Sequence, residues 1–221
     1  PDQKKNFVFL GEAGSGKSEI AVNLACILAE NEESGKEVHF FDLDQTKPLF
    51  RSRDVKDQLE RNRVQVHFEQ QLLDAPTMAG GVGRCLQDEK CLTILDVGGN
   101  QAGARMIGGF SGFLNQDNTE VCFVINPYRP WSKDVISIDQ TLSSILKVSH
   151  VRKVTIISNP NLGETTEVEE VLEGHKKVLN IIEEFLPVSC LCVRKDLYQQ
   201  VREKTQTPIF PLDLRMQYKD I

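Results

Sequence analysis

The 221-residue chain is long enough to bury a sizeable core, and its 40% hydrophobic and 26% charged residues are typical of globular proteins. Its formal net charge of −6 argues against non-specific nucleic-acid binding, which needs a basic face that displaces phosphate counterions. No apolar stretch approaches the roughly 18 residues of a membrane-spanning helix, so we expect no membrane insertion.

Apolar runs alternate with stretches of helical periodicity along the whole chain. From the amino terminus we expect a strand at 6–10, a helix at 18–30, strands at 37–43 and 64–68, a helix at 77–88, a strand at 91–97, a helix at 102–114, a strand at 120–126, a helix at 133–147, a strand at 152–158, a helix at 164–186 and a strand at 188–193. Continuous apolar strands separated by helices predict a parallel sheet covered on both faces. The prediction is therefore one α/β domain over residues 1–221, with a doubly wound, mostly parallel sheet of about seven strands flanked by helices.

The sequence GEAGSGKS, residues 11–18, lies between the first expected strand and the helix that follows it. It matches G-x-x-x-x-G-K-[ST], in which the glycines let backbone N–H groups point at phosphate oxygens. The start of the helix adds its positive end, Lys17 would neutralise charge on the β- and γ-phosphates, and Ser18 would ligate Mg²⁺. We predict that nucleotide is bound by Gly11, Glu12, Ala13, Gly14, Ser15, Gly16, Lys17 and Ser18.

Carboxylates follow two other expected strands, where a phosphate loop needs groups that hold magnesium and order the attacking water. Asp42 and Asp44 come at the end of the strand 37–43, and Asp96 comes near the end of the strand 91–97, before Gly98 and Gly99. An aspartate at such a position can also cap the next helix. Four apolar residues before Asp96 and two glycines after it favour a role at the phosphates.

The stretch NLACILAENEESGKEVHFFDLDQ, residues 23–45, resembles the ParA/MinD/ArsA family of P-loop ATPases, which belongs to the SIMIBI class. In that family the phosphate-loop helix runs into a Gly-Lys turn, a strand and an Asp-x-Asp pair. The resemblance continues in order through ILDVGG at 94–99, INPYRP at 125–130 and ISNPNLG at 157–163. It therefore covers most of the chain.

The resemblance implies an ATPase with ATP and Mg²⁺ as ligands. By this resemblance Asp44 would position the hydrolytic water, and Asp42 would lie in the magnesium shell with Ser18 and Asp96. Asp96 would be the Walker B carboxylate. Lys17, Asp44 and Asp96 are then the expected catalytic residues.

The same resemblance implies a switch and a base site. Gly98 and Gly99 would begin the segment that senses the γ-phosphate, while Asn159 and its neighbour Pro160 would meet adenine. A GTPase normally reads guanine with Asn-Lys-x-Asp, and the sequence SNPN at 158–161 lacks that aspartate. We therefore expect ATP rather than GTP.

One residue departs from the family pattern. The family usually carries a second lysine directly after the first glycine of the cradle, and this lysine reaches the phosphates of a dimer partner. Glu12 occupies that position here, so the lysine's role is lost or moved elsewhere. Lys47, Arg51 and Arg53 are candidate substitutes, and their alternative interpretation is a solvated basic turn.

The six cysteines favour reduced, buried thiols over a disulfide framework, so we expect a cytoplasmic protein. Cys190 and Cys192 lie two apart in an expected strand, which places both sulfurs on one side. They read mainly as small core residues, although a metallocofactor-maturing relative could use such a pair to bind metal across a dimer. His39, His67 and His150 show no metal-ligand spacing with the cysteines.

Two functions remain open from the sequence. The first is a slowly hydrolysing ATPase that acts as a nucleotide-dependent switch on a protein client, with metalloenzyme maturation as the leading guess and a homodimer as one arrangement. The second is a small-molecule kinase or ligase on a dethiobiotin-synthetase-like scaffold, which needs cationic anchors near the γ-phosphate. Membrane and nucleic-acid outputs of the family fit poorly with the carboxyl-terminal sequence and the acidic balance.

Overall fold

The computed structural model describes residues 4–31, 35–44, 50–68 and 75–216. Within these residues eight strands form one sheet, in which every neighbouring pair is parallel. The strand order is β3-β2-β4-β1-β5-β6-β7-β8. The strands are β1 (Asn6–Leu10), β2 (Glu37–Leu43), β3 (Val64–Phe68), β4 (Cys91–Val97), β5 (Thr119–Ile125), β6 (Thr155–Ser158), β7 (Val188–Arg194) and β8 (Ile209–Leu212).

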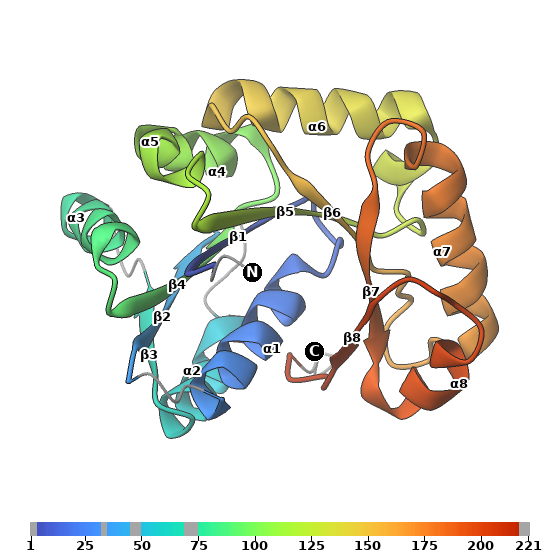
Figure 1. Cartoon of the computed structure of the whole chain (residues 1–221), viewed down its shortest axis with the longest axis horizontal. Helices are drawn as coiled ribbons and strands as arrows, with labels where there is room; N and C mark the ends of the chain where they lie inside the picture. Colours follow the sequence, from blue (N-terminus) through green and yellow to red (C-terminus); the bar gives the residue numbers. More distant parts are fainter. Residues whose placement is uncertain (1–3, 32–34, 45–49, 69–74, 217–221) are drawn as a thin grey trace.

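Helices cover both faces of the sheet (Figure 1). The hydrophobic core on one face contains residues of α1 and α2. The core on the other face contains residues of α3 to α8. The helices are α1 (Lys17–Glu30), α2 (Phe50–Arg61), α3 (Ala75–Gln87), α4 (Gln101–Met106), α5 (Ser111–Leu114), α6 (Val135–Ser149), α7 (Val168–Ile182) and α8 (Tyr198–Arg202), with short 3₁₀ turns η1 (Ile107–Phe110), η2 (Pro130–Ser132) and η3 (Lys195–Leu197). The predicted α/β class with a doubly wound parallel sheet is confirmed.

The sequence prediction missed three elements. The edge strand β8 is flanked and interrupted by Pro208 and Pro211, which remove ladder donors and so are tolerated at a sheet edge. In the part of α2 whose side chains the structure describes, residues 55–61, only Val55 and Leu59 are buried apolar anchors, so its periodicity is weak. The five-residue helix α8 is too short for a periodic signal.

The helix expected at 102–114 is divided into α4, η1 and α5. The division falls at the adjacent glycines Gly108 and Gly109, which are poor helix formers. A Cβ added at Gly108 would lie 2.9 Å from the carbonyl oxygen of Val148, so the close packing of this segment against the end of α6 also requires glycine there.

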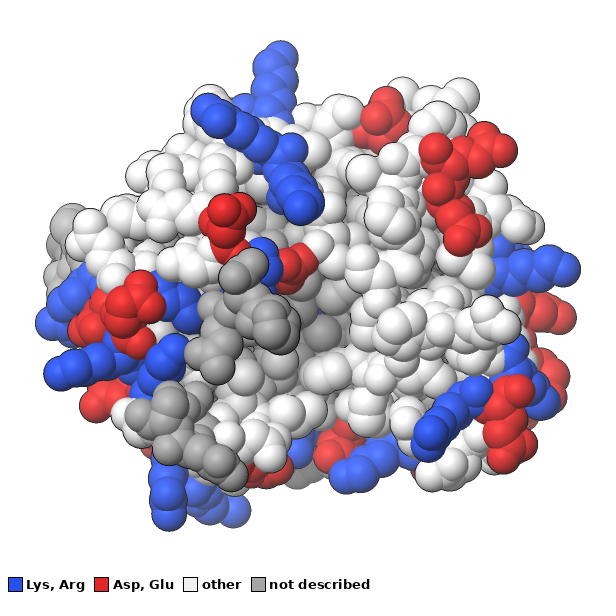
Figure 2. Space-filling view, viewed as in Figure 1, with Lys and Arg blue, Asp and Glu red and all other residues white. Residues whose placement is uncertain are grey.

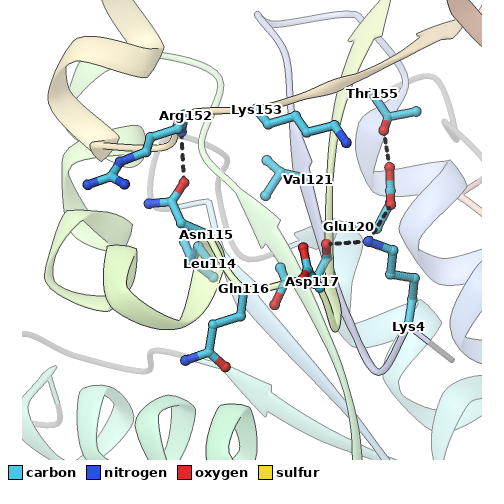
Figure 3. Close-up of a pocket in the computed structure, with 11 residues that line it drawn as sticks. Lys4, Leu114, Asn115, Gln116, Asp117, Glu120, Val121, Arg152, Lys153 and Thr155 are labelled. Atoms are coloured by element: carbon cyan, nitrogen blue, oxygen red, sulfur yellow. Dashed lines mark hydrogen bonds and ion pairs between the residues drawn. The ribbon is translucent and has the colours of Figure 1, made fainter. Parts of the chain in front are cut away.

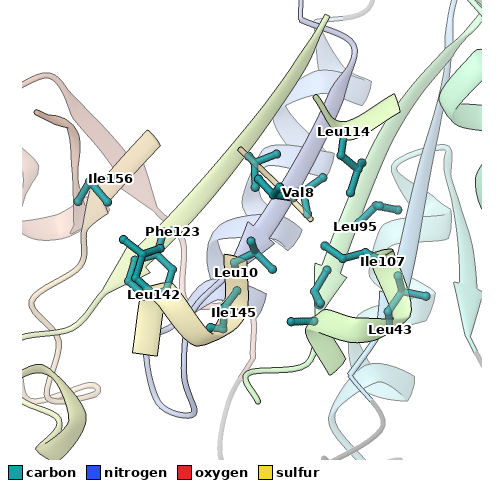
Figure 4. Packing of buried hydrophobic residues seen from close by; sticks show 14 of the residues in the cluster. Val8, Leu10, Leu43, Leu95, Ile107, Leu114, Phe123, Leu142, Ile145 and Ile156 are labelled. Atoms are coloured by element: carbon teal, nitrogen blue, oxygen red, sulfur yellow. The ribbon is translucent and has the colours of Figure 1, made fainter. Parts of the chain in front are cut away.

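The central strands carry the core (Figure 4). On one face Val8 of β1, Leu95 of β4 and Phe123 of β5 meet Leu142 and Ile145 of α6, and all five side chains are buried. Complete burial of each such side chain stabilises the fold by about 1.5–3 kcal/mol. This packing fixes the strand ends, and with them the loops that follow the strands.

The order of the strands reverses at β1. Strands β2 to β4 lie on one side of β1, and strands β5 to β8 lie on the other. In an open parallel sheet such a reversal leaves a crevice outside the carboxyl ends of the strands. Because the sheet is parallel, β1, β2, β4, β5 and β6 all end at that edge. The fold therefore gathers the predicted motifs, which are spread over some 150 residues, at one edge.

Among the described residues visible in Figure 2, Lys and Arg side chains lie beside Asp and Glu around the rim, and much of the centre is uncharged. The basic side chains on this face therefore do not form the continuous patch that non-specific nucleic-acid binding needs. No helix in the described part of the chain is both long and apolar enough to cross a membrane.

Candidate functional site

Residues 11–16 form a tight loop after β1, and Lys17 and Ser18 begin α1. Gly16 precedes the helix with φ 89° and ψ 10°, a left-handed conformation that side chains disfavour. A Cβ at Gly16 would also lie 2.1 Å from Nδ2 of Asn159, so only glycine fits. The loop leads directly into the amino terminus of α1, whose N–H groups and dipole attract anions.

Lys17 and Asp44 form a buried ion pair at the base of this loop. Lys17 Nζ lies 3.1 Å from Asp44 Oδ2, and the two side chains are 2% and 3% exposed. Asp42 supports the pair from β2, because its Oδ1 accepts a hydrogen bond from the backbone N–H of Asp44 at 3.0 Å. A charge held in such a site needs a partner, since breaking a buried pair costs about 3–5 kcal/mol.

Asp96 lies directly across the sheet from Asp42, in the parallel register of β2 and β4. It is 4% exposed, and among the described residues its Oδ1 has no hydrogen-bond partner. A buried carboxylate oxygen without a partner is costly unless a cation or donor completes it. Together with the hydroxyl of Ser18 on α1, this oxygen gives the hard donor set that Mg²⁺ prefers.

The segment after β4 approaches the loop closely. A Cβ at Gly99 would lie 2.8 Å from the carbonyl oxygen of Gly11 and 2.9 Å from the backbone nitrogen of Ala13. A Cβ at Gly98 would lie 3.3 Å from Asp44 Oδ1. The segment then enters α4, where the Asn100 side chain accepts from the Gly103 N–H at 2.9 Å. Gly99 and Asn100 therefore connect the cradle to the first turn of α4.

The loop after β5 supports the cradle, and the sequence prediction did not assign it this role. Asn126 is fully buried, and its Nδ2 donates to the carbonyls of Gly14 at 3.1 Å and of Asn161 at 2.8 Å. Trp131 Nε1 donates to Ala13 O at 3.2 Å. The sequence INPYRP, residues 125–130, resembles the family, but no local pattern in it predicts the contacts of Asn126 with the cradle.

Arg129 brings a cation to the cradle from the same loop. Its Nε donates to the carbonyl of Gly14 at 3.1 Å, and the structure gives it no carboxylate partner among the described residues. A guanidinium in this place is suited to phosphate oxygens, which it can bind in a bidentate manner.

Asn159 and Pro160 lie after β6, as the resemblance implied, but the Asn159 side chain contacts the cradle. Its Nδ2 donates to the carbonyl of Ser15 at 2.7 Å, and the residue is 3% exposed. Pro160 is buried against α7, where a Cβ at Gly174 would lie 2.6 Å from its Cβ. The described role of Asn159 is thus to fix the loop, and base contact stays a prediction.

A pocket extends from Asn159 and Pro160 towards the end of β7. Asn161, Arg194 and Leu214 share its lining, and no carboxylate side chain lines it within the described part of the chain. Arg194 is held in place by Asp196, with Nη2 to Oδ2 at 2.8 Å. The sequence prediction did not find Arg194 or Leu214, because they follow the last expected strand without a motif.

Glu12 has a described partner within the cradle itself. Its Oε1 accepts a hydrogen bond from the backbone N–H of Ala13 at 3.0 Å. The substitute cations that we predicted lie outside what the structure describes, because Lys47 and the side chains of Arg51 and Arg53 are not described. The kinase or ligase alternative depended on the same three residues, so it stays a prediction.

Cys190 and Cys192 lie side by side in β7, as strand alternation predicts. They belong to the core beneath α1, and a hydrogen bond from Cys192 holds the pKa of Cys190 below its usual value while burial raises the pKa of Cys192. Among the described residues, no further His, Cys, Asp or Glu side chain completes a metal site around them. Their described role is packing.

Comparisons with known proteins agree with this geometry. Residues 7–191 match the family model of the CobQ/CobB/MinD/ParA nucleotide binding domain. The chain resembles, with 15% identity and a TM-score of 0.53, a candidate plasmid partition protein from Borrelia burgdorferi B31 bound to AMPPNP, covering 88% of this chain and 90% of that one. A comparison with curated proteins gives no match.

Two further structures share the fold. They are the signal recognition particle receptor FtsY from Elizabethkingia anophelis (17% identity, TM-score 0.52, 86% of this chain) and FlhF complexed with GMPPNP and Mg²⁺ (16%, 0.51, 78%). The chain spans 60% of that FtsY chain and 62% of that FlhF chain. Since this family model matches residues 7–191, which is most of the sequence, the chain belongs to the CobQ/CobB/MinD/ParA nucleotide binding domain family.

Proposed function

We propose that the protein binds MgATP in the 11–18 loop, hydrolyses it slowly, and acts as a nucleotide-dependent switch on a protein client. The observation that carries this proposal is the buried ion pair between Lys17 Nζ and Asp44 Oδ2 at 3.1 Å. The two side chains to which we assign phosphate binding and water positioning are in contact, so we expect that binding at one changes the state of the other.

The ion pair gives a sequence of events for the chain's own groups. When the phosphates arrive, Lys17 exchanges a carboxylate partner for phosphate oxygens, which are also anionic. Asp44 then loses that contact and can accept a hydrogen bond from the attacking water, which it orients. Asp42 keeps the Asp44 backbone in position through the 3.0 Å hydrogen bond.

Magnesium would be held by Ser18, Asp42 and Asp96, and would supply charge neutralisation at the β- and γ-phosphates. The unpartnered Asp96 Oδ1 supports this assignment. The chain itself contributes the cation of Lys17 and the guanidinium of Arg129 at the cradle. Arg129 thereby offers positive charge on the side of Gly14, near the position where Glu12 replaces the family's second lysine.

The lining of the pocket after Asn159, which we assign to the base, supports ATP over GTP. Guanine recognition normally needs a carboxylate that accepts the imino and amino protons, and the described lining of the pocket after Asn159 holds none. Arg194 lines the same pocket and is a donor only, so it suits an acceptor nitrogen of a base. Structural neighbours bind both kinds of nucleotide, since one is described with AMPPNP and another with GMPPNP.

A client is supported by the surface beside the cradle. A groove there is lined by Glu12, by residues 99–102 of the switch segment, and by α6 residues that include Gln140 and Ser144. The first turn of α6 exposes Val135 and Ile136, at 39% and 65%. Nucleotide contacts at Gly99 can therefore alter a surface on which a partner protein could bind. Metalloenzyme maturation is the client pathway that we put first.

The decisive experiment compares two buried lysines. Lys17→Met is expected to remove nearly all MgATP binding measured by calorimetry, because the phosphates lose their main cation. Lys5→Met is the matched control, since Lys5 is also 2% exposed but lies at the other end of β1, where it pairs with Glu89 at 3.3 Å. Unchanged affinity in a folded Lys17→Met protein would refute the proposal, and tighter GTP than ATP binding would refute the base assignment.

A homodimer is tested through Glu12. A carboxylate facing a partner's triphosphate would repel it, so we expect weak association in the presence of a non-hydrolysable ATP analogue. Glu12→Lys should strengthen that association, and Glu12→Gln should separate loss of charge from gain of a cation. Sedimentation of all three proteins measures this. A tight analogue-dependent dimer of the native chain that Glu12→Lys abolishes would show that Glu12 belongs to the interface.

A further inference from the structure

A second cluster of reactive side chains lies at the amino-terminal end of the sheet, opposite the cradle. It contains His39 of β2, Cys85 near the end of α3 and Cys91 at the start of β4. One imidazole nitrogen and the two sulfurs all lie within 4.8 Å of one another, and the residues are 5%, 2% and 6% exposed. No step of nucleotide binding uses these residues.

The sheet register builds this cluster. Glu37 of β2 lies opposite Cys91 of β4, and His39 lies opposite Thr93, so both partners of each row point to the same face. That face is covered by α3, whose Cys85 belongs to the same core cluster as Cys91. The three ligand atoms thus come from three elements, which explains why sequence spacing gave no sign of them.

We propose that His39, Cys85 and Cys91 form a binding site for a zinc-class divalent metal ion, separate from the magnesium of the cradle. Nitrogen and sulfur donors in this combination select borderline-soft ions such as Zn²⁺ over Mg²⁺. With Zn–N of about 2.05 Å and Zn–S of about 2.3 Å in a tetrahedron, ligand atoms lie about 3.3–3.8 Å apart. The described separations reach this arrangement with movements of about 1 Å or less at each side chain.

The imidazole of His39 is oriented for this role. Its Nδ1 lies 3.0 Å from His67 Nε2, while its Nε2 is buried and makes no hydrogen bond with any described residue. A ligating histidine commonly uses its other ring nitrogen to donate to a second group, which fixes the tautomer and the ring direction. His67 is itself held in a stack, with its ring 5.3 Å from that of His39 and 4.3 Å from that of Phe41.

We assign the fourth ligand to Glu37, at the surface side of the cluster. Glu37 Oε2 lies 3.5 Å from His39 Nε2, close to the separation of about 3.3 Å expected for nitrogen and oxygen ligands of one tetrahedral ion. The Glu37 side chain is 65% exposed, and Gln65 Nε2 holds the same oxygen at 3.0 Å. Because this carboxylate is exposed, it can turn towards the ion and complete the four ligands.

The surroundings of the cluster are polar in a way that a purely apolar core does not explain. Thr93 Oγ1 and Asn6 Oδ1 are also buried without a hydrogen-bond partner among the described residues. Both lie in one register row with His39 across β1, β4 and β2. Unsatisfied polar atoms are costly in a core, and of these three residues only His39 belongs to the group within 4.8 Å.

The thiols are protected in the metal-free chain. Burial raises the pKa of Cys85 to about 12 and also raises the pKa of Cys91. Thiols that stay protonated oxidise slowly, because the thiolate is the reactive form. A metal ion that coordinates both sulfurs displaces their protons, so uptake releases protons to the solvent.

The test uses the whole chain, reduced, treated with EDTA and free of nucleotide. Zn²⁺ is titrated in competition with a chromogenic chelator, and we expect one tightly bound ion per chain. Co²⁺ is the spectroscopic probe, and sulfur-to-cobalt charge-transfer absorption would report thiolate ligation. Thermal unfolding should move to higher temperature with Zn²⁺, since an ion that binds only the folded chain stabilises it.

Variants assign the ligands. Cys85→Ser and Cys91→Ser are each expected to lose the charge-transfer band and to weaken Zn²⁺ binding by more than the roughly 10–100-fold typical of lost second-shell partners. His67→Ala should fall within that 10–100-fold range and keep the band. Cys122→Ser is the matched control, since Cys122 is a strand cysteine with 5% exposure, and it should change neither readout.

If a variant fails to fold, a measurement on the unchanged chain still tests the proposal. Zn²⁺ should protect Cys85 and Cys91, but not Cys122, from alkylation in partly denaturing urea, as mapped by mass spectrometry. Absence of a stoichiometric Zn²⁺ site, or equal loss of binding in Cys122→Ser, would overturn the proposal. So would a Cys85–Cys91 disulfide that forms in air and persists in the presence of Zn²⁺.

Discussion

The two ends of one sheet carry two different kinds of site. At the carboxyl end, charged groups from separate loops are already paired, as in the 3.1 Å contact between Lys17 and Asp44. At the amino end, uncharged thiols and an imidazole lie together, and His39 Nε2 has no hydrogen-bond partner among the described residues. Loops whose ends are fixed by strands suit a ligand that comes and goes, whereas donors on two strands and the helix that covers them suit an ion that stays.

A third location sharpens this contrast. A pocket at the amino end of β5 and β6 contains Lys4 and Glu120, which point toward one another (Figure 3). Lys4 Nζ lies 3.3 Å from Glu120 Oε2, and Thr155 donates to the other oxygen of the same carboxylate. Here the buried end of the carboxylate is satisfied by its neighbours, in contrast to His39 Nε2.

The largest effect that we expect is on turnover at the carboxyl end. Asp44→Asn should lower the rate of ATP hydrolysis about a hundredfold or more, because a group that positions water acts mainly in the transition state. MgATP affinity should change little. Asp117→Asn, an exposed aspartate at the amino end, is the control and should retain full activity. Full turnover in the Asp44→Asn protein would show that Asp42 and Asp44 have only a structural role.

The second effect is on stability and concerns the cradle backbone. Gly16→Ala should lower the free energy of unfolding by about 2 kcal/mol or more, since a left-handed φ and the 2.1 Å contact with Asn159 Nδ2 both penalise a Cβ. Gly35→Ala is the matched control, with φ 75° and no described atom within 4 Å of the added Cβ, and should cost about 1 kcal/mol. Equal losses in urea unfolding would show that the Asn159 contact imposes no constraint.

A smaller effect is expected from the cation of the β5 loop. Arg129→Ala should weaken MgATP binding about tenfold, or about 1.4 kcal/mol, because an exposed charge-assisted contact to phosphate is lost. The difference should shrink at high salt, which screens exposed charges. Arg152→Ala removes an exposed arginine at the other end of the sheet and should leave calorimetric affinity unchanged. An Arg129→Ala protein with native affinity would show that its guanidinium only braces Gly14.

The smallest effect tests a buried histidine that, unlike His39, is fully partnered. His175 Nδ1 lies 3.1 Å from Ser158 Oγ and Nε2 lies 2.9 Å from Thr207 Oγ1, and burial lowers its pKa from the usual 6.5. The unfolded chain then binds a proton more readily than the folded chain, so this contribution to stability is present above about pH 6.5 and is lost as pH falls through the folded-state pKa. His175→Gln should flatten the decline in unfolding free energy between pH 7.5 and 5.5, and an unchanged slope would contradict it.

Local patterns were sufficient for most of the architecture. Buried parallel strands read as continuous apolar runs because both faces are covered, and the P-loop is recognisable because its glycines, lysine and serine are contiguous. Asp42, Asp44 and Asp96 could be placed at the same edge, since parallel strands share the direction of their carboxyl ends. The missed strand β8 and helices α2 and α8 have weak patterns, because prolines or sparse apolar positions hide them.

The contacts that complete the two sites could not be predicted from local sequence patterns. Asn126 reaches Gly14 across 112 residues, and Asn159 reaches Ser15 across 144. No local spacing encodes such contacts, because they depend on which strands become neighbours and in what register. His39, Cys85 and Cys91 show no metal-ligand spacing for the same reason, although the sheet brings their ligand atoms within 4.8 Å.

The sequence by itself determined the class of fold, the phosphate loop and the carboxylates that face it, since each of these is encoded within a few adjacent residues. Only the tertiary structure decided the partner of each group: Asp44 for Lys17, the Ala13 N–H for Glu12, and the Ser15 carbonyl for Asn159. The physical reason is that hydrogen bonds and ion pairs are formed over about 3 Å. At that range, strand order and register decide which side chains can meet.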